Sequence, residues 1–261
     1  MTEPCRALRG LLEAVVREYR RILGRNLAGI YLHGSAAFGC FRWQTSDIDL
    51  LVAVHAPPSS RQKDGLVRTL LAQGTAAPPA GFEMSVVLVR YCRQFVWPVP
   101  YELHFSNMHR ASFEKDLSAA CARMHGTDKD LAAHFAVTRA AGVTLWGESP
   151  RTMFCAIPPG AYKAAILYDA ATAVQDAGPK PVQVVLNLCR ALAFWRQGLV
   201  LSKQQGGQWA LAHLAVQWHP VVRAALQSYT QGAPFCAPSG QARAFASWAL
   251  QGLPPPRSID E

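Results

Sequence analysis

The sequence has no long hydrophobic run. No stretch approaches the roughly 20 consecutive apolar residues that span a membrane. The first residues, which include Glu3 and Arg6, lack the apolar core of a signal peptide. With 261 residues, half of them hydrophobic, the chain can nevertheless build a substantial core. We therefore expect a cytoplasmic protein that does not span a membrane and folds as one large domain or two smaller ones.

Paired cysteine motifs are also missing. The seven cysteines are odd in number and widely spaced, and none forms a C-x-x-C pair. This pattern argues against a disulfide framework and against a zinc site, and it is typical of a reducing compartment.

The chain is basic but has no basic tract. Its 26 lysines and arginines exceed its 17 acidic residues, which gives a net charge of +9. Aromatic residues do not interleave with a basic strip, so the charge is better explained by attraction for a nucleotide than by nucleic-acid binding. A cationic substrate would have to be held by local carboxylates.

What the sequence does contain is a Gly-Ser turn followed by acidic strands. Gly34-Ser35 ends a β-forming run, and Asp47-x-Asp49 opens a run that becomes wholly apolar. Because side chains alternate along a strand, the two aspartates should point the same way, roughly 7 Å apart. Glu83 opens a third apolar run, which a sheet could place beside the aspartates.

These residue types suit a metal-dependent phosphate chemistry. Carboxylates completed by phosphate oxygens and water are preferred ligands of Mg²⁺, and Glu83 could either bind metal or remove a proton from an attacking hydroxyl. A lone Asp-x-Asp could be a solvated strand end. The full combination is more specific, because charged residues are avoided in apolar strands unless they are paired or bind metal.

The Gly34-Ser35 turn suits phosphate binding. Glycine lets the backbone approach a phosphate closely, and the serine hydroxyl and nearby N–H groups can donate to its oxygens. A helix expected to start near Ala36 would add a favourable dipole.

Two segments carry a family resemblance. LHGSAAFG at 32–39 and SDIDLLV at 46–52 resemble the DNA polymerase β-type nucleotidyltransferase superfamily. Within it, the chain resembles the aminoglycoside adenylyltransferases that modify streptomycin and spectinomycin. Further matching segments extend the resemblance over essentially the whole chain: residues 83–88, 101–105, 128–131, 143–147, 184–190 and 202–203.

The predicted fold has two parts. Residues 1–157 should form an α/β nucleotidyltransferase domain, a mixed sheet flanked by helices, and residues 158–261 an all-α helical bundle. The resemblance implies that the bundle closes over nucleotide and acceptor. We expect strands at 28–33, 47–54 and 83–89, and helices at 6–25, 61–73, 128–141, 161–176, 181–196, 203–215, 218–230 and 239–251. Asp128 should cap its helix, whereas Gly206 and Gly207 should weaken the start of theirs.

The resemblance also implies an activity and a set of site residues. The reaction would be Mg²⁺-dependent transfer of AMP from ATP to a hydroxyl of a small polycationic aminoglycoside or aminocyclitol, which confers resistance. Asp47, Asp49 and Glu83 would hold magnesium, two ions by the family pattern, and Glu83 would be the catalytic base. The nucleotide would be bound by Gly34, Ser35, Ser46, Arg190, Lys203 and Tyr229. The cationic acceptor would be bound by Glu102, Asp130 and Asp176.

The drug site departs from the family pattern. Met108 and Ala171 stand where the family has tryptophans, and Lys180 stands where it has an acid. These departures weigh against streptomycin more than against spectinomycin. Two alternatives therefore remain open for a protein that we expect to be monomeric: an adenylyltransferase with another acceptor (tRNA, protein or metabolite), or a nucleotide-binding regulator without catalytic activity.

Overall fold

The computed structural model describes residues 3–260, with side chains from residue 6 onward. The chain forms two compact units, Met1–Ala156 and Ile157–Glu261. The division in the sequence falls one residue before the predicted boundary. Within the described residues, none of the helices combines the length and apolar character that a membrane span requires.

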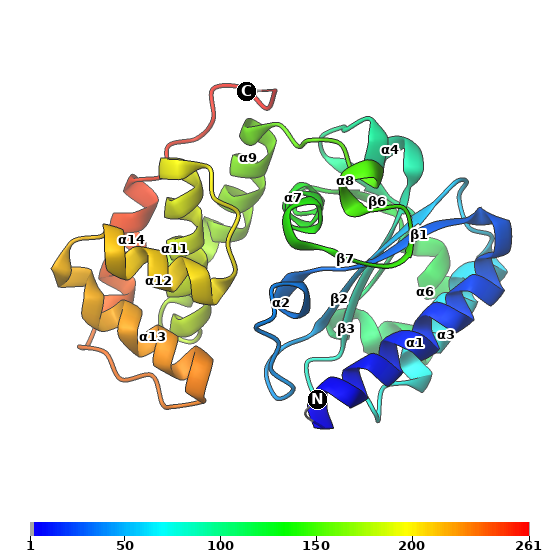
Figure 1. The fold of residues 1–261 in the computed structure, drawn as a ribbon, viewed down its shortest axis with the longest axis horizontal. Helices are drawn as coiled ribbons and strands as arrows, with labels where there is room; N and C mark the ends of the chain where they lie inside the picture. Colours follow the sequence, from blue (N-terminus) through cyan, green and yellow to red (C-terminus); the bar gives the residue numbers. More distant parts are fainter. Residues whose placement is uncertain (1–2, 261) are drawn as a thin grey trace. The chain divides into compact units, whose positions relative to one another are not determined.

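A five-stranded mixed sheet organises the first unit, in the order β5-β3-β2-β1-β7 (Figure 1). Only the central pair β2 and β3 is parallel; the other neighbours are antiparallel. The strands are β1 (Leu27–Leu32), β2 (Ile48–Val54), β3 (Phe82–Leu88), β5 (Leu103–Phe105) and β7 (Val143–Gly147). The central strands read as continuous apolar runs because helices cover both faces of the sheet.

Two groups of helices flank this sheet (Figure 1). On one face, α1 (Glu3–Leu23) packs against α3 (Ser60–Ala72), which also contacts α6 (Leu117–Arg123). On the other face, α7 (Leu131–Ala141) contacts α2 (Gly34–Ala37) and α8 (Pro150–Met153). The first group closes the main core, while Tyr31 of the sheet packs edge-on against Phe154 on the second face. The predicted α/β class is confirmed.

Shorter elements complete the first unit. A separate two-stranded sheet joins β4 (Val99–Tyr101) to β6 (Gly126–Asp128), and α4 (Val89–Arg93) and α5 (Arg110–Lys115) lie in the connections.

One local prediction was wrong here, and one strand was missed. Asp128 ends strand β6 instead of capping a helix, because its Oδ1 accepts the backbone N–H of Asp130 at 2.9 Å, and α7 begins only at Leu131. Strand β7 was not predicted, because this edge strand is largely exposed and has no alternating apolar pattern.

The second unit is an all-α bundle, as predicted. Its central helix is α11 (Pro181–Gln197), which contacts α12 (Lys203–His213), α13 (His219–Gln231) and α14 (Gln241–Gln251). The single helix predicted at 161–176 is interrupted by a 3-10 turn, so that α9 (Pro159–Asp169) and α10 (Ala173–Asp176) are separate.

The start of α12 is stronger than predicted. Ser202 and Gln205 form a reciprocal capping box, in which each side chain accepts the other residue's backbone N–H. Gly206 and Gly207 face the neighbouring helices closely: a Cβ at Gly206 would lie 2.7 Å from Arg190 Cγ, and one at Gly207 would lie 2.6 Å from Leu226 Cδ2. The two glycines therefore permit close packing of α12 against its neighbours, a role that the expectation of a weakened helix start did not include.

Candidate active site

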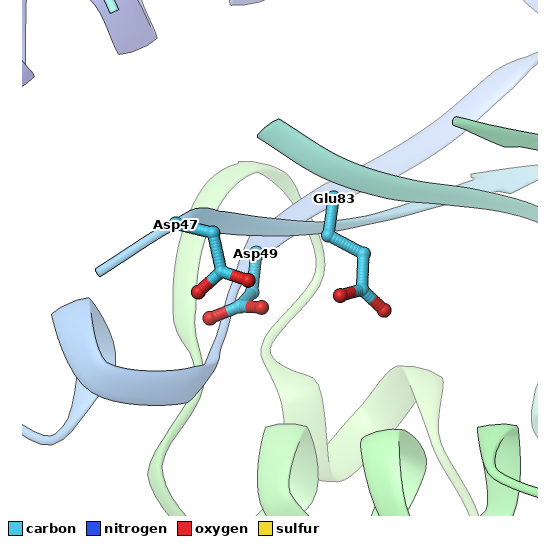
Figure 2. Close-up of side chains that lie close together, drawn as sticks. All are labelled: Asp47, Asp49 and Glu83. Atoms are coloured by element: carbon cyan, nitrogen blue, oxygen red, sulfur yellow. The ribbon is translucent and has the colours of Figure 1, made fainter. Parts of the chain in front are cut away.

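Three carboxylates converge where the parallel pair β2 and β3 begins. Asp49 is paired in register with Glu83, and Asp47 lies directly before β2. One oxygen from each of the three side chains lies within 4.8 Å of the other two, and Figure 2 shows the carboxylates pointing toward one another. Parallel pairing thus brings together acids that are 34 residues apart in the sequence.

The Gly34 turn fits closely over this cluster. The backbone N–H of His33 donates to the carbonyl of Asp49 at 3.0 Å, which joins the end of β1 to the acidic strand. Gly34 has φ +60°, and a Cβ at this position would overlap the Asp49 carboxylate. Glycine is therefore required for two reasons, the left-handed backbone and the absence of a side chain.

The two serines predicted to bind phosphate differ in their surroundings. The Oγ atom of Ser35 is buried and has no hydrogen-bond partner among the described residues. Ser46 Oγ accepts the backbone N–H of Arg42 at 3.0 Å, and the N–H of Ser46 donates to the Arg42 carbonyl at 2.8 Å. Ser46 thus closes the loop that leads into Asp47, whereas the buried Ser35 hydroxyl can still donate a hydrogen bond to a ligand.

Burial and charge act together on Glu83. Burial raises the pKa of its carboxyl group, and the nearby Asp47, Asp130 and Asp128 raise it further, while His134 lowers it. The net direction is upward, toward the range in which a carboxylate is an effective general base.

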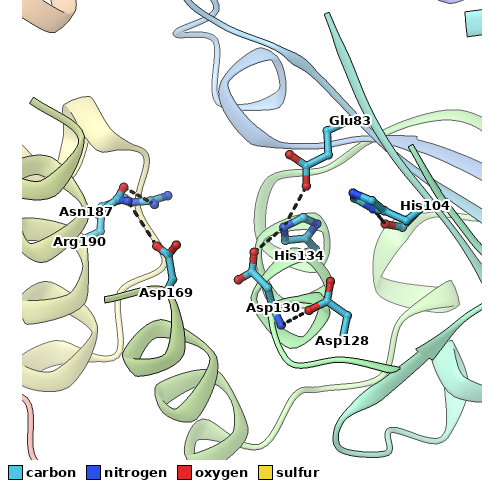
Figure 3. A network of polar contacts seen from close by, with 9 residues as sticks. Glu83, His104, Asp128, Asp130, His134, Asp169, Asn187 and Arg190 are labelled. Atoms are coloured by element: carbon cyan, nitrogen blue, oxygen red, sulfur yellow. Dashed lines mark hydrogen bonds and ion pairs between the residues drawn. The ribbon is translucent and has the colours of Figure 1, made fainter. Parts of the chain in front are cut away.

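A histidine from α7 completes the network, as Figure 3 shows. His134 Nε2 lies 3.1 Å from Asp130 Oδ2 and 3.8 Å from Glu83 Oε1. Burial alone would lower the pKa of His134, but Asp130, Glu83 and Asp49 together raise it to about 10. His134 therefore carries a positive charge at neutral pH, beside the carboxylate cluster.

Two further histidines near the network are neutral. Burial and the neighbouring His134 hold the pKa of His33 well below its usual range. The ring centroids of His33 and His134 are 5.0 Å apart. Burial also lowers the pKa of His104 to about 4, helped by His134 and His109. His104 Nδ1 lies 3.0 Å from Ser85 Oγ.

The second unit has a polar cluster of its own, on α9 and α11 (Figure 3). Arg190 Nη2 donates to Asn187 Oδ1 at 2.8 Å, and Asn187 Nδ2 donates to Asp169 Oδ2 at 3.4 Å. The Arg190 Nε atom is buried and has no hydrogen-bond partner among the described residues. Arg190 stands on α11 and packs against Gly206 of α12, and its Nε–H group can still donate a hydrogen bond to an anion.

The remaining predicted site residues lie in several elements. Lys203 is the first residue of α12, and Tyr229 packs on the core of the helical unit. Asp176 accepts a hydrogen bond from Thr172 Oγ1 at 2.7 Å. Glu102 is half-buried and donates its backbone N–H to the Val86 carbonyl, beside the strand that carries Glu83.

His134 is the residue that the sequence interpretation missed. Its spacing of four from Asp130 was an available signal, because residues at i and i+4 meet on one face of a helix. The expected helix from Asp128 already placed both residues on one face, but Asp130 was considered only as a ligand of the acceptor.

The donor set fits a hard divalent cation. Three carboxylates with oxygens this close repel one another unless a cation or proton lies among them. Oxygen ligands of this kind suit Mg²⁺, which is usually bound by one or two carboxylates together with water and phosphate.

Comparison with known proteins finds relatives of similar sequence. The sequence profile of the C-terminal domain of aminoglycoside adenylyltransferase matches residues 152–251. An aminoglycoside (3'') (9) adenylyltransferase of Klebsiella pneumoniae is 29% identical over 231 residues, 84% of either chain. A spectinomycin 9-adenylyltransferase of Staphylococcus aureus is 25% identical over 202 residues, 73% of either chain.

A solved structure shares the fold. Spectinomycin adenyltransferase AAD(9) from Enterococcus faecialis, determined with ATP and spectinomycin, superposes with a TM-score of 0.76. The match covers 94% of the present chain and 98% of that protein, at 16% sequence identity.

Proposed function

We propose that the chain, which is similar to aminoglycoside adenylyltransferases, is a member of that family and transfers AMP from ATP to a hydroxyl group of an aminoglycoside or aminocyclitol antibiotic. The observation that carries this proposal is the convergence of Asp47, Asp49 and Glu83 to within 4.8 Å. The names of the relatives and the ATP and spectinomycin in the structural neighbour support the same reaction.

In the proposed reaction, the acceptor oxygen attacks the α-phosphorus of ATP while the bond to pyrophosphate breaks. Glu83 takes the proton from the attacking hydroxyl, a role that its raised pKa favours. Asp47 and Asp49 would hold magnesium, which when bound would supply positive charge to the triphosphate and the leaving group. The products are the AMP ester of the antibiotic and pyrophosphate. Modification of the antibiotic would make the bacterium that produces the enzyme resistant to it.

Each unit offers candidate groups for binding the nucleotide. The Gly34 turn lets the backbone approach a phosphate, and the Ser35 hydroxyl, which has no hydrogen-bond partner among the described residues, donates to it. Ser46 holds the loop beside Asp47. In the helical unit, Arg190 and Lys203 contact phosphates, and Tyr229 stacks on the adenine.

The acceptor is a cation and is held by carboxylates, for which Glu102, Asp130 and Asp176 are the candidates. Met108, 87% exposed, and Ala171, also exposed, offer no large ring for stacking. We therefore expect spectinomycin to be a better acceptor than streptomycin.

The direct test uses purified protein with ATP, Mg²⁺ and a panel of aminoglycosides and aminocyclitols. Pyrophosphate release and a mass increase of one AMP on the antibiotic should appear together. Labelling of tRNA or protein from α-labelled ATP, with inert antibiotics, would show that the acceptor is a different one. Tight ATP binding without turnover on any acceptor would identify a regulator and contradict the proposed reaction.

Glu83→Gln isolates the base. The amide cannot take a proton, so kcat should fall by a factor of about 10² or more, with ATP binding retained. The exposed Glu13 on α1 provides a matched control, Glu13→Gln, which should keep the parental rate. A Glu83→Gln enzyme that transfers AMP at the parental rate would refute the assignment of the base.

A further inference from the structure

A histidine contacts the proposed base on the side of Glu83 that faces Asp130 (Figure 3). His134 Nε2 approaches Asp130 Oδ2 at 3.1 Å and Glu83 Oε1 at 3.8 Å, so one ring nitrogen faces two carboxylates. The proposed transfer of AMP uses Glu83 but assigns nothing to His134.

The imidazole is held firmly from its own helix. Asp130 directly precedes α7, and its backbone N–H is bound by Asp128 Oδ1 at 2.9 Å. Buried side chains anchor the helix itself: Leu131, Ala132, Phe135, Val137 and Thr138. The ring of His134 also lies against the ring of His33, with centroids 5.0 Å apart. A side chain restrained in this way can fix the position of a partner that is less restrained.

Glu83 has two competing partners. It can turn one oxygen toward Asp47 and Asp49 and share their metal, or it can keep that oxygen for the proton of the acceptor. Asp47 and Asp49 each place an oxygen within 4.8 Å of a Glu83 oxygen, and His134 Nε2 lies 3.8 Å from Glu83 Oε1. The hydrogen bond of His134 Nε2 goes to Asp130, and at 3.8 Å its contact with Glu83 Oε1 is an ion pair that can hold this carboxylate beside the imidazole.

We propose that His134, anchored by Asp130, is a positioning residue that holds Glu83 as the base and leaves the metal to Asp47 and Asp49. The proposal rests on the proposed AMP transfer for its kinetic consequence, but its geometric consequence can be measured without turnover. It divides the three carboxylates into two that bind metal and one that takes a proton. It also gives Asp130 a role through His134.

The test compares His134→Leu with His134→Gln in the full-length protein. Leucine removes the donor, so kcat should fall by about 10² because the base is no longer oriented, while the KM for ATP stays unchanged. Glutamine retains an N–H donor on a side chain of similar reach, and it should restore kcat to within about tenfold of the parental value. His55→Leu, at an exposed position after the far end of β2, is the matched control and should behave as the parental enzyme.

A second measurement uses Mn²⁺ alone, followed by electron paramagnetic resonance in the absence of nucleotide. If His134 restrains Glu83, His134→Leu frees the carboxylate to join the aspartates. Mn²⁺ should then bind about tenfold more tightly, a change of the size produced by partners of metal ligands. In Glu83→Gln, the affinity for Mn²⁺ should stay near the parental value.

The outcomes separate the two proposals. Unchanged or weaker Mn²⁺ binding in His134→Leu, or equal kcat values for the leucine variant and the parent, overturns the positioning role. If the parental protein transfers AMP to no acceptor, the proposed function fails, yet the Mn²⁺ comparison still tests the role of His134. Should the leucine variant unfold, the folded glutamine variant decides: a loss of kcat as large as that of Glu83→Gln overturns the role.

Discussion

The two units of the chain present polar side chains in different ways. In the sheet unit, Asp49 and Glu83 stand on adjacent parallel strands, and backbone pairing sets their spacing. In the helical unit, Arg190 stands on a long helix, and its position depends on a hydrogen bond to Asn187 and on close packing against Gly206. The acidic site is thus set by main-chain pairing, whereas the basic cluster is set by side-chain packing.

This difference predicts how each site fails. A change at the acidic site alters reacting groups whose backbone remains in place, so activity should suffer more than stability. A change beside Arg190 alters the packing of helices, so stability should suffer together with nucleotide affinity. The predictions below test this contrast.

Asp49→Asn should have the largest effect. The substitution removes a charge from the proposed metal pair at nearly constant volume, and metal ions supply several kcal/mol of charge stabilisation in such reactions. We expect kcat/KM to fall by about 10³ or more, with Mn²⁺ binding strongly weakened and thermal stability retained. Pyrophosphate release measures the first effect and electron paramagnetic resonance the second. Retained Mn²⁺ affinity would mean that Asp49 does not hold the metal.

Gly34→Ala should damage both activity and stability. The methyl group would overlap the Asp49 carboxylate, and the left-handed backbone adds strain of about 1–3 kcal/mol. Displacing that carboxylate should lower kcat by about 10². Gly24→Ala is the matched control: Gly24 also has a positive φ, +53°, but a Cβ there meets nothing within 4 Å. A similar loss of activity in both variants would show that backbone strain, and not the carboxylate, is responsible.

Arg190→Ala should act mainly on the nucleotide. Hydrogen bonds to charged groups contribute about 1.5–3 kcal/mol, so the KM for ATP should rise by a factor of about 10 or more while kcat changes less. Steady-state kinetics with varied ATP measures this rise. Arg223→Ala, at an exposed position on α13, is the control. If Arg190→Ala lowers stability and leaves the KM for ATP unchanged, the arginine is only a packing residue.

The same contrast explains how far the sequence alone could lead. The acidic cluster was predictable, because Asp-x-Asp between apolar strands and a strand-borne Glu83 are local patterns that alternation converts into geometry. The pairing of Asp49 with Glu83 was not, since a parallel register is decided by contacts distant in the sequence.

Features that depend on tertiary packing were harder to predict. Strand β7 is short and largely exposed, and its place in the sheet depends on its pairing with β1. The pair of Asp130 and His134 was readable from its spacing, but its contact with Glu83 depends on how α7 packs on the sheet. The role of Gly206 depends on which helix lies opposite, and a sequence does not show that.

Gly206→Ala should have the smallest effect on activity and tests the packing side of the contrast. The added Cβ would lie 2.7 Å from Arg190 Cγ and 3.0 Å from its backbone nitrogen, so α11 and α12 must move apart. Overpacking of this kind costs about 1–3 kcal/mol, which denaturant unfolding measures. Gly10→Ala on α1 is the matched helical control: its Cβ meets nothing within 4 Å, so the same substitution should stabilise the protein by about 0.4–1 kcal/mol. Equal responses at the two glycines would mean that helix propensity, and not contact with Arg190, determines the result. A loss of stability confined to Gly206→Ala, with at most a small rise in the KM for ATP, would show that the close packing of α12 on α11 requires a residue without a side chain at this position.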